Sequence, residues 1–135
     1  MDEVRVDGAI ATATYFLQLF PYALNTGDSS GWDALSHPDC RFCSGLSDEV
    51  KRQAALLEHQ EGLATSISSA SGVEVDPGVW FTIDLDITQG KSRVVDSTGS
   101  VLLEGPEQRS HVTMIVIRDN DRWLVRGAQI DPQNG

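Results

Sequence analysis

The feature that most constrains the fold is a change in the spacing of apolar residues at Gly62. Before it, apolar side chains recur every three or four positions, which is the period of an amphipathic helix. After it, apolar and polar residues alternate and β-branched residues become frequent, which is typical of strands. A chain with its helices first and its strands after them folds as segregated layers. We therefore predict an α+β fold in which N-terminal helices pack on a curved antiparallel sheet.

The first predicted helix begins at Asp7, whose carboxylate can accept the free amide hydrogens of a first turn. Phe16 and Phe20 lie on its apolar stripe, so we expect both in the core. Pro21 lies inside the helix, which therefore either kinks there or gives way to a second short turn. Residues 25–28 (Asn-Thr-Gly-Asp) supply a stop signal. The spacing thus predicts a long helix that the sheet encloses.

Two further helices are expected before the sheet. A short one is capped by Asp28 or Ser29 and passes through Trp32 to Leu35. A loop with two cysteines follows, and a third helix opens with Ser47 as its cap and runs to about residue 61. Gly62 then ends the helical half of the chain.

The second half is predicted to be a meander of antiparallel strands at residues 63–68, 79–88, 92–103, 110–118 and 122–130. Residues 96–99 break the third strand with a turn, and residues 118–121 form a hairpin turn. In the second strand, Phe81 and its alternate neighbours face inward, so Trp80, Asp84 and Asp86 face solvent. An exposed Trp80 is a candidate contact surface. No linker or repeat interrupts the pattern, so residues 1–135 are expected to form a single domain.

Composition excludes several function classes. The chain is 40% hydrophobic, which is normal for a globular protein, and its net charge is −10. This charge repels nucleic acid and anionic lipid head groups, so neither is an expected partner. No apolar run approaches the roughly 18 residues of a membrane span, and the first residues lack the features of a signal peptide.

Cys40 and Cys43 are the two cysteines of the chain. Such a pair can form a tight disulfide, bind metal or exchange electrons. For zinc, His37 extends the pattern to three ligands, whereas closed structural sites take four. A thioredoxin-like pair belongs to a βαβ unit, which this pattern lacks. We predict a structural disulfide, which places the protein outside the cytoplasm.

The whole chain resembles the nuclear-transport-factor-2-like (cystatin-like cone) superfamily, with residues 11–28 as its long first helix. Residues 25–28, 32–36 and 40–43 further resemble an actinobacterial family of predicted exported lipoproteins of unknown function. In that family the cone domain follows a lipid-anchored leader and a low-complexity tether, neither of which is visible here. The resemblance implies an extracellular protein, or one anchored on the outer face of the membrane as a lipoprotein.

The cone fold also implies a pocket between the long helix and the concave face of the sheet. Tyr15 and Tyr22 are spaced to share a helix face that would line this pocket, so both are candidate ligand-binding residues. Two phenols in an apolar pocket can donate hydrogen bonds to a ligand carbonyl, as in the ketosteroid isomerases of the same superfamily. The alternative is that both are ordinary core or rim tyrosines with satisfied hydroxyls.

No catalytic residue, metal site or cofactor site is recognisable. His37, His59 and His111 have no visible triad partner, and no inward-facing ionisable residue appears on the predicted strands. We therefore expect a noncatalytic module of the cell envelope that binds a small apolar ligand or another envelope protein. The alternatives are a small-molecule enzyme of the ketosteroid isomerase or dehydratase type and a purely structural accessory domain. Because Asp84 and Asp86 face outward, a copy of the sheet would bring like charges together, so we expect a monomer in dilute solution.

Overall fold

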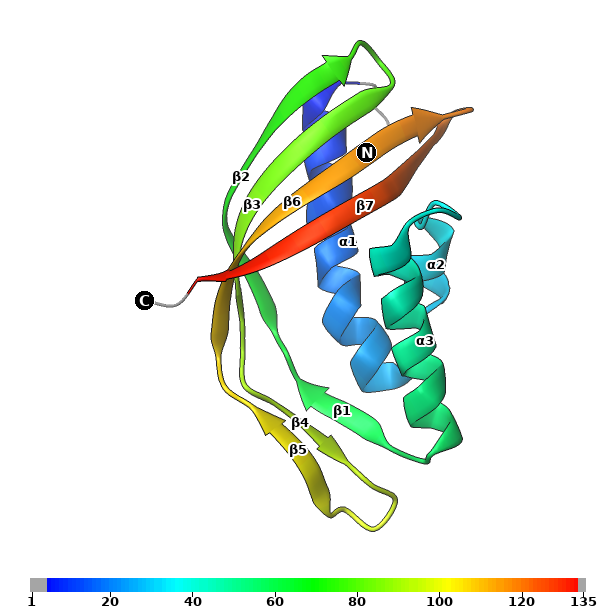
Figure 1. Ribbon diagram of the computed structural model, residues 1–135, viewed down its shortest axis with the longest axis vertical. Helices are drawn as coiled ribbons and strands as arrows, with labels where there is room; N and C mark the ends of the chain where they lie inside the picture. The colour runs from blue at the N-terminus through cyan, green and yellow to red at the C-terminus, as the bar shows by residue number, and fades with distance from the viewer. Residues whose placement is uncertain (1–4, 134–135) are drawn as a thin grey trace.

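The computed structural model describes residues 5–133, which form three helices followed by seven strands (Figure 1). The helices are α1 (Val6–Thr26), α2 (Ser30–Ala34) and α3 (Arg41–Ala55). The strands are β1 (His59–Gly62), β2 (Thr65–Asp76), β3 (Trp80–Gln89), β4 (Ser92–Val95), β5 (Val101–Gly105), β6 (Gln108–Asp119) and β7 (Arg122–Gln133). This order confirms the predicted α+β class and the division of the chain near Gly62.

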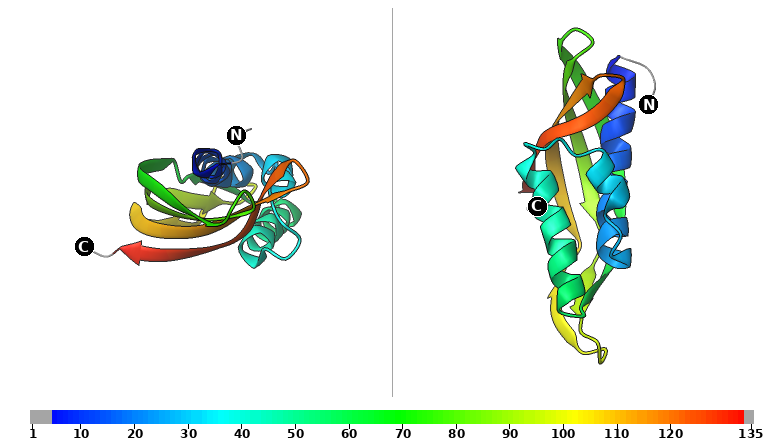
Figure 2. Two further views of the ribbon diagram at one scale, coloured as in Figure 1. Left: turned by 90° about the horizontal axis from the view of Figure 1, so that it is seen from above. Right: turned by 90° about the vertical axis from the view of Figure 1, so that its right-hand side faces the viewer.

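The strands form two antiparallel sheets. The larger has the order β2-β3-β6-β7 and the smaller the order β1-β4-β5. The chain passes from one sheet to the other between β1 and β2, between β3 and β4, and between β5 and β6, so the sheets meet at a narrow waist (Figure 1). Helix α1 crosses one face of the larger sheet, and α2 and α3 lie at its β7 side (Figure 2). Within residues 5–133, no helix lies against the opposite face of that sheet.

The core lies between α1 and the larger sheet. The inward face of the sheet supplies fully buried aliphatic and aromatic side chains: Phe81, Ile83, Leu85, Val112, Met114, Val116 and Val125. From the helices, Phe16 stacks on Trp32 with ring centroids 3.7 Å apart. Phe20 meets the same indole edge-on at 5.9 Å. The alternation read from the strand at residues 79–88 is thereby confirmed, except that Val79 itself is exposed.

Helix α1 is continuous through Pro21, which settles the choice between one helix and two. It begins one residue earlier than predicted, with Arg5 at the N-cap and Asp7 in the first turn. At its other end Gly27 adopts a left-handed conformation (φ 77°) and donates its N–H to the carbonyl of Ala23, as the stop signal predicts. Among the described helices, none is both long and apolar enough to cross a membrane.

The third helix differs most from the prediction, because it occupies Arg41–Ala55 rather than residues 47–61. Its N-cap is Cys40, whose Sγ accepts the N–H of Cys43 at 3.1 Å, so the expected cysteine loop is the first turn of the helix. Its other end gives way to β1, where His59 and Gly62 pair with β4. Residues 58–61 have good intrinsic helix propensity, and tertiary pairing overrides it.

Two of the turns agree with the sequence pattern. Asp96 and Ser100 close the turn between β4 and β5 through a backbone hydrogen bond of 3.0 Å. Asn120 and Asp121 both have positive φ and join β6 to β7 as a two-residue hairpin. By contrast, β2 extends well beyond the predicted residues 63–68, to Asp76.

Candidate functional site: the outer face of the larger sheet

The open face of the larger sheet is composed of alternate residues from its four strands, and the strand register aligns them in rows. Because Phe81 and Leu85 of β3 face inward, their neighbours face outward. The successive outward rows read Asp76-Trp80-Ile117-Leu124, Val73-Thr82-Ile115-Gly127, Ser71-Asp84-Thr113-Gln129 and Ser69-Asp86-His111-Asp131. We call this surface the outer face. The first two rows are mainly apolar and the last two are polar and acidic.

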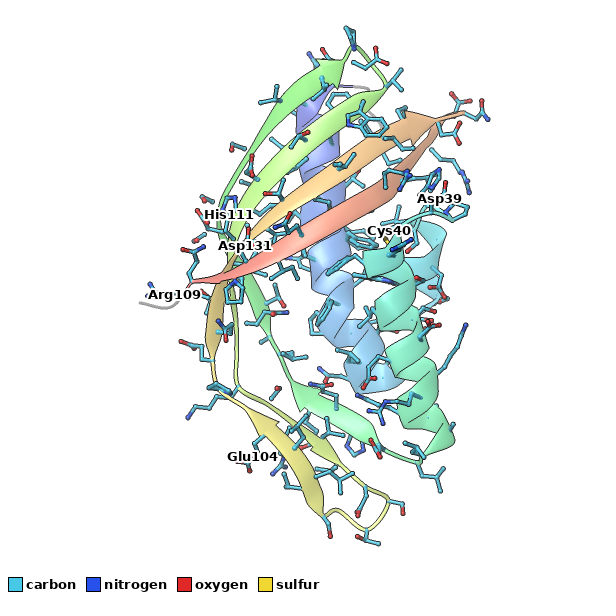
Figure 3. The ribbon with its side chains drawn as sticks, in the orientation of Figure 1. Asp39, Cys40, Glu104, Arg109, His111 and Asp131 are labelled. Carbon is cyan, nitrogen blue, oxygen red and sulfur yellow. A yellow bond between two sulfur atoms is a disulfide. The ribbon has the colours of Figure 1, made fainter. Side chains whose placement is uncertain are left out.

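His111 is the centre of the polar rows. Its Nδ1 lies 2.9 Å from Oδ1 of Asp86, and its Nε2 lies 3.0 Å from Oδ1 of Asp84. Thr113 Oγ1 donates to the same Asp84 oxygen at 3.0 Å, and Ser69 Oγ donates to Asp86 at 2.7 Å. The imidazole is therefore held between two carboxylates that both come from β3. Figure 3 shows where His111 lies on the larger sheet.

The two carboxylates change the acid–base properties of this cluster. Their hydrogen bonds, first that of Asp86 and then that of Asp84, raise the pKa of His111 above its ordinary value. The hydrogen bonds from His111 and Ser69 lower the pKa of Asp86. A ring with a carboxylate at each nitrogen favours the imidazolium form. Such a ring has no free lone pair, so it is poorly suited to act as a general base.

The apolar rows continue the same surface toward the β2–β3 and β6–β7 turns. Trp80 is partly exposed and lies opposite Ile117, which in turn lies opposite Leu124. Leu124 is 2% exposed although it is on the outer face, and the chain after α2 runs beside it, where Ser36 pairs with Val125. Beside them, Val73 is 63% exposed. The outer face thus combines a large aromatic residue and aliphatic neighbours with an acidic cluster, and the predicted outward position of Trp80 is correct.

The interior offers no comparable group. Among residues 5–133 the buried polar side chains are those of Thr12, Ser47, Gln53 and Ser110, and no ionisable side chain is fully buried. No buried polar side-chain atom of the described residues lacks a hydrogen-bond partner. The space between α1 and the sheet is therefore filled mainly by apolar side chains of the described residues.

The two tyrosines do not lie where the sequence analysis placed them. Tyr15 is 47% exposed and Tyr22 is 50% exposed, whereas Phe16 and Leu17 fill the side of α1 that faces the sheet. The expectation that both phenols line an enclosed pocket is therefore wrong. The physical reason is that the apolar surface of α1 extends over two faces of the helix. Such a helix can bury one apolar face against the sheet and leave the other, here the face with the tyrosines, exposed. Whether either tyrosine binds a ligand stays a prediction.

Cys40 and Cys43 form a disulfide at the start of α3. Both residues are buried, and the indole Nε1 of Trp32 donates to the carbonyl of Cys43 at 2.8 Å. The bridge thereby joins the start of α3 to the aromatic core around Phe16. With both sulfurs in the bridge, neither is a zinc-binding thiolate, and among the described residues no cluster of three or more His, Cys, Asp or Glu is arranged to hold a metal.

A surface hollow of about 620 Å³ lies beside the disulfide. Arg41 and Arg126 line it, and Arg126 already donates to the backbone carbonyl of Asp39 at 3.2 Å. Figure 3 shows Asp39 and Cys40 on the side of the molecule away from His111. The hollow borders the outer face at Gly127, and neither Tyr15 nor Tyr22 lines it.

The sequence alone does not identify the cluster of Asp84, Asp86 and His111. Strand alternation places both aspartates outward, but the sequence shows no triad partner for His111. The cluster depends on the pairing of Asp86 with His111 across β3 and β6. The hairpin turn at residues 118–121 fixes which residues of β6 pair with β7. It does not fix which residues of β6 pair with β3, so the sequence near His111 does not identify Asp86 as its partner.

A protein family matches the chain over nearly its whole length. Residues 1–129 match DUF6318, a family of unknown function. The chain belongs to this family. No curated protein matches the chain. Membership of DUF6318 therefore does not indicate an activity. The role of the outer face has to be inferred from the chemistry of its own residues.

Solved structures share the fold of this DUF6318 chain at low identity. The intermembrane space region of the chloroplast protein ARC6 is 12% identical with a TM-score of 0.67, covering 96% of this chain and 98% of that one. A protein with a cystatin-like fold from Caulobacter vibrioides is 12% identical with a TM-score of 0.57 (92% and 89%). A putative scytalone dehydratase from Novosphingobium aromaticivorans is 9% identical with a TM-score of 0.61 (94% and 85%). The chain has the cystatin-like fold, which carries many functions.

Proposed function

We propose that this protein is a noncatalytic module that acts outside the cytoplasm and binds another protein of the cell envelope through the outer face. The observation that carries the proposal is the combination of Trp80 and its aliphatic neighbours with the acidic cluster around His111, on a sheet face that no helix covers. Partly exposed aromatic residues are frequent anchors of protein interfaces, and charged neighbours add specificity.

Of the two ligand classes expected from the sequence, the structure favours a protein over a small apolar molecule. A pocket for an apolar ligand needs an enclosed hollow lined by apolar side chains. In this fold that space is occupied by Phe16, Trp32 and Phe81, each at most 1% exposed. Part of the apolar surface that remains accessible, including Val73, lies on the outer face, where an open surface suits a protein partner.

An isomerase or dehydratase would need an acid and a base that both face a substrate pocket. The described interior has no buried carboxylate, histidine or tyrosine, and its buried polar groups are hydroxyls and one amide. The likeness to a putative scytalone dehydratase is one of fold at 9% identity. The noncatalytic function is therefore the better supported of the two.

Action outside the cytoplasm rests on the Cys40–Cys43 bridge, because such bonds persist in oxidising compartments. The resemblance to exported lipoproteins supports the same compartment and adds a lipid anchor before the domain. Mass spectrometry of the N-terminus of the protein isolated from its host tests the anchor. A diacylated cysteine is expected, and an unmodified N-terminus in the cytoplasmic fraction would overturn this part of the proposal.

Site-specific photo-crosslinking in the host tests the outer face. A photoreactive residue at Thr82, next to Trp80, is expected to give an adduct with one recurrent envelope protein. The matched control is Lys51, an exposed residue of α3 on another side of the molecule. The captured protein is then purified, and its affinity for the domain is measured by calorimetry.

The expected result is that Trp80→Ala weakens binding of the captured protein at least about tenfold, since an anchor truncated to alanine typically has an effect of this size or more. Lys51→Ala should leave the affinity unchanged. Equal adducts from both positions, or binding that Trp80→Ala does not alter, would refute the assignment of the outer face.

A further inference from the structure

The hollow beside the disulfide holds two guanidinium groups that come from different elements. Arg41 is the first residue of α3, Arg126 lies in β7, and both line the hollow of about 620 Å³. The side chain of Arg41 is exposed and has no hydrogen-bond or ion-pair partner among residues 5–133. Arg126 donates one of its N–H groups to the backbone carbonyl of Asp39 at 3.2 Å. The hollow therefore contains strong hydrogen-bond donors that the rest of the described fold leaves available.

A β-bulge accounts for the position of Arg126. The residues before and after it pair with Val116 and Ile115 of β6, so Arg126 itself has no residue opposite it. The extra residue of a bulge leaves the regular inward and outward alternation of its strand, and bulges often direct a side chain toward a functional site. The guanidinium of Arg126 accordingly lies beside Asp39, in the hollow.

The charge of the lining residues indicates the class of ligand. Arg41 and Arg126 are positive and Asp39 is negative, so the lining carries a net charge of +1 in a chain whose net charge is −10. Oδ2 of Asp39 lies 3.9 Å from Arg126, and the Asp39 side chain is 70% exposed, so it neutralises Arg126 only weakly. A carboxylate, with its single charge, balances this lining, whereas phosphate would leave an excess of negative charge. Guanidinium groups also match carboxylates in geometry, because they can donate two parallel hydrogen bonds.

Part of the remaining lining is apolar. Phe42 and Ala128 both line the hollow, and both are partly buried and packed against the core. Side chains held in this way give the hollow a fixed apolar wall next to the two guanidinium groups. The hollow therefore suits a carboxylate that is carried on an apolar stem.

The shape of the hollow favours a group that belongs to a protein. Small ligands usually bind in sites that enclose most of their surface, whereas this hollow is open at Arg41 and Asp39. A side chain or chain end of a docked protein would be enclosed from both sides. Gly127 lies both in the lining of the hollow and in a row of the outer face, so one partner can reach both surfaces.

We infer that the hollow binds a carboxylate that the envelope partner presents next to its contact with the outer face, with Arg41 and Arg126 as the binding residues. This inference rests on the proposed function, because the same partner occupies both surfaces. The outer face has the acidic cluster around His111, whereas the hollow is positive. A partner must then carry complementary charges of both signs in the right order, which fixes its orientation.

A small probe tests the carboxylate site without the partner. N-acetylleucine carries one carboxylate on an apolar stem, and N-acetylleucinamide is its neutral match. In ¹⁵N NMR spectra of the whole chain, N-acetylleucine should shift the backbone N–H signals of Gly127 and Ala128 to saturation, with a Kd on the order of 1–10 mM. Added salt should weaken this binding, because the attraction is between charges. N-acetylleucinamide should leave both signals in place, and inorganic phosphate should bind less tightly than N-acetylleucine.

Substitutions test the role of the guanidinium groups. Arg41→Gln should raise the Kd for N-acetylleucine at least about threefold, and Arg41→Lys should raise it less because the charge remains. The matched control is Lys91→Gln, which removes the same charge at an exposed residue between β3 and β4 and should leave the Kd unchanged. Saturable binding of N-acetylleucinamide at the same signals, tighter binding of phosphate, or no response to Arg41→Gln would each overturn the carboxylate site.

Calorimetry with the captured envelope protein separates this inference from the proposed function. Arg41→Gln should weaken the complex at least about threefold, whereas Lys91→Gln should not. A complex that Trp80→Ala weakens and Arg41→Gln does not would support the outer face and overturn the inference. A complex that Arg41→Gln weakens and Trp80→Ala does not would support the hollow and refute the outer face.

Discussion

His111 is held on the outer face by two carboxylates of the neighbouring strand β3. The pKa of its imidazole therefore differs between the folded and the unfolded protein. Its pKa is raised by Asp86 and Asp84, whereas that of Asp86 is lowered by His111 and Ser69. The two shifts act in opposite pH ranges. The histidine contribution is fully present below its ordinary pKa of 6.5 and disappears as pH rises through the raised value. The aspartate contribution is present above 3.8 and disappears as pH falls through the lowered value. The cluster therefore stabilises the fold most between these two limits.

The first prediction concerns this histidine. An NMR titration of the imidazole should give a pKa above 6.5 for His111. Asp86→Asn should bring this pKa back toward 6.5, because the substitution removes the charge from the hydrogen-bond partner that raises it most. Denaturant melts should also show that the wild type loses more stability than Asp86→Asn when pH rises from 6 to 8. A pKa at or below 6.5, or no response to Asp86→Asn, would contradict the described geometry.

The second prediction is that Phe16→Ala lowers the free energy of unfolding by about 3–5 kcal/mol. The ring is fully buried and stacks on Trp32, so its removal leaves a cavity that rigid neighbours cannot fill. Phe20→Ala should have a smaller effect because that ring is only partly buried. Urea denaturation followed by tryptophan fluorescence measures both. A loss below 1 kcal/mol for Phe16→Ala would mean that the side chain is not in the core.

The buried or exposed position of a residue could be predicted from the sequence where the spacing of apolar residues follows one clear helical or strand period. The burial of Phe16 and Phe81 and the outward position of Asp84 follow from helical spacing and from strand alternation. The exposure of Tyr15 did not follow, because α1 is apolar on more than one side and local spacing does not say which side the sheet covers. The pairing of His111 with Asp86 depends on non-local strand register, which sequence periodicity alone does not give.

At the scale of elements, helix and strand types were predicted well and boundaries were predicted poorly where tertiary contacts decide them. Helix α3 starts at the disulfide rather than at Ser47, because Cys40 provides its N-cap and Trp32 binds its first turn. Strand β1 replaces a predicted helix end, because pairing with β4 and the contact of Glu61 with Arg93 favour the extended conformation. Strand β2 was underestimated because its serines and glycine lack a strong strand signal.

The third prediction concerns the disulfide. The double substitution Cys40→Ser/Cys43→Ser should lower the free energy of unfolding by about 2 kcal/mol, since a loop this short restricts the unfolded chain only modestly. A serine at position 40 can still accept the N–H of residue 43, so α3 should keep its N-cap. Circular dichroism should show an unchanged helix content. Alkylation of the unreduced wild type should modify neither cysteine; two modified thiols would disprove the bridge.

The fourth prediction concerns the end of β1. Gly62 has φ 91°, and a Cβ there would lie 2.0 Å from the carbonyl oxygen of Lys91. Gly62→Ala should therefore destabilise the protein by at least about 2 kcal/mol, from backbone strain plus the clash. Gly99 is a matched control, because it has a similar φ of 86° but an added Cβ would meet nothing within 4 Å. Gly99→Ala should cost only about 1 kcal/mol. Equal losses would mean that β1 and the chain at Lys91 do not approach as closely as described.

At the scale of the whole molecule, the fold leaves one large sheet face uncovered and fills the space that related folds can use as a pocket. Helix α1 covers one face of the larger sheet, and α2 and α3 lie beside β7 (Figure 2). The opposite face has both the apolar rows around Trp80 and the acidic cluster around His111. Sequence alternation predicted the outward position of Trp80. It did not predict that Ile117 and Leu124 join it, because that requires the order of strands in the sheet.

The fifth prediction tests the central claim, which is that the outer face is where this protein meets its partner. The chain has three tryptophans, and each indole N–H gives one signal in a ¹⁵N-labelled sample. On addition of the captured envelope protein, the indole signal of Trp80 should shift or broaden at equimolar ratio. Those of Trp32 and Trp123, both buried, should stay in place. A shift at Trp32 or Trp123 with Trp80 unchanged would place the partner elsewhere and contradict the proposed function.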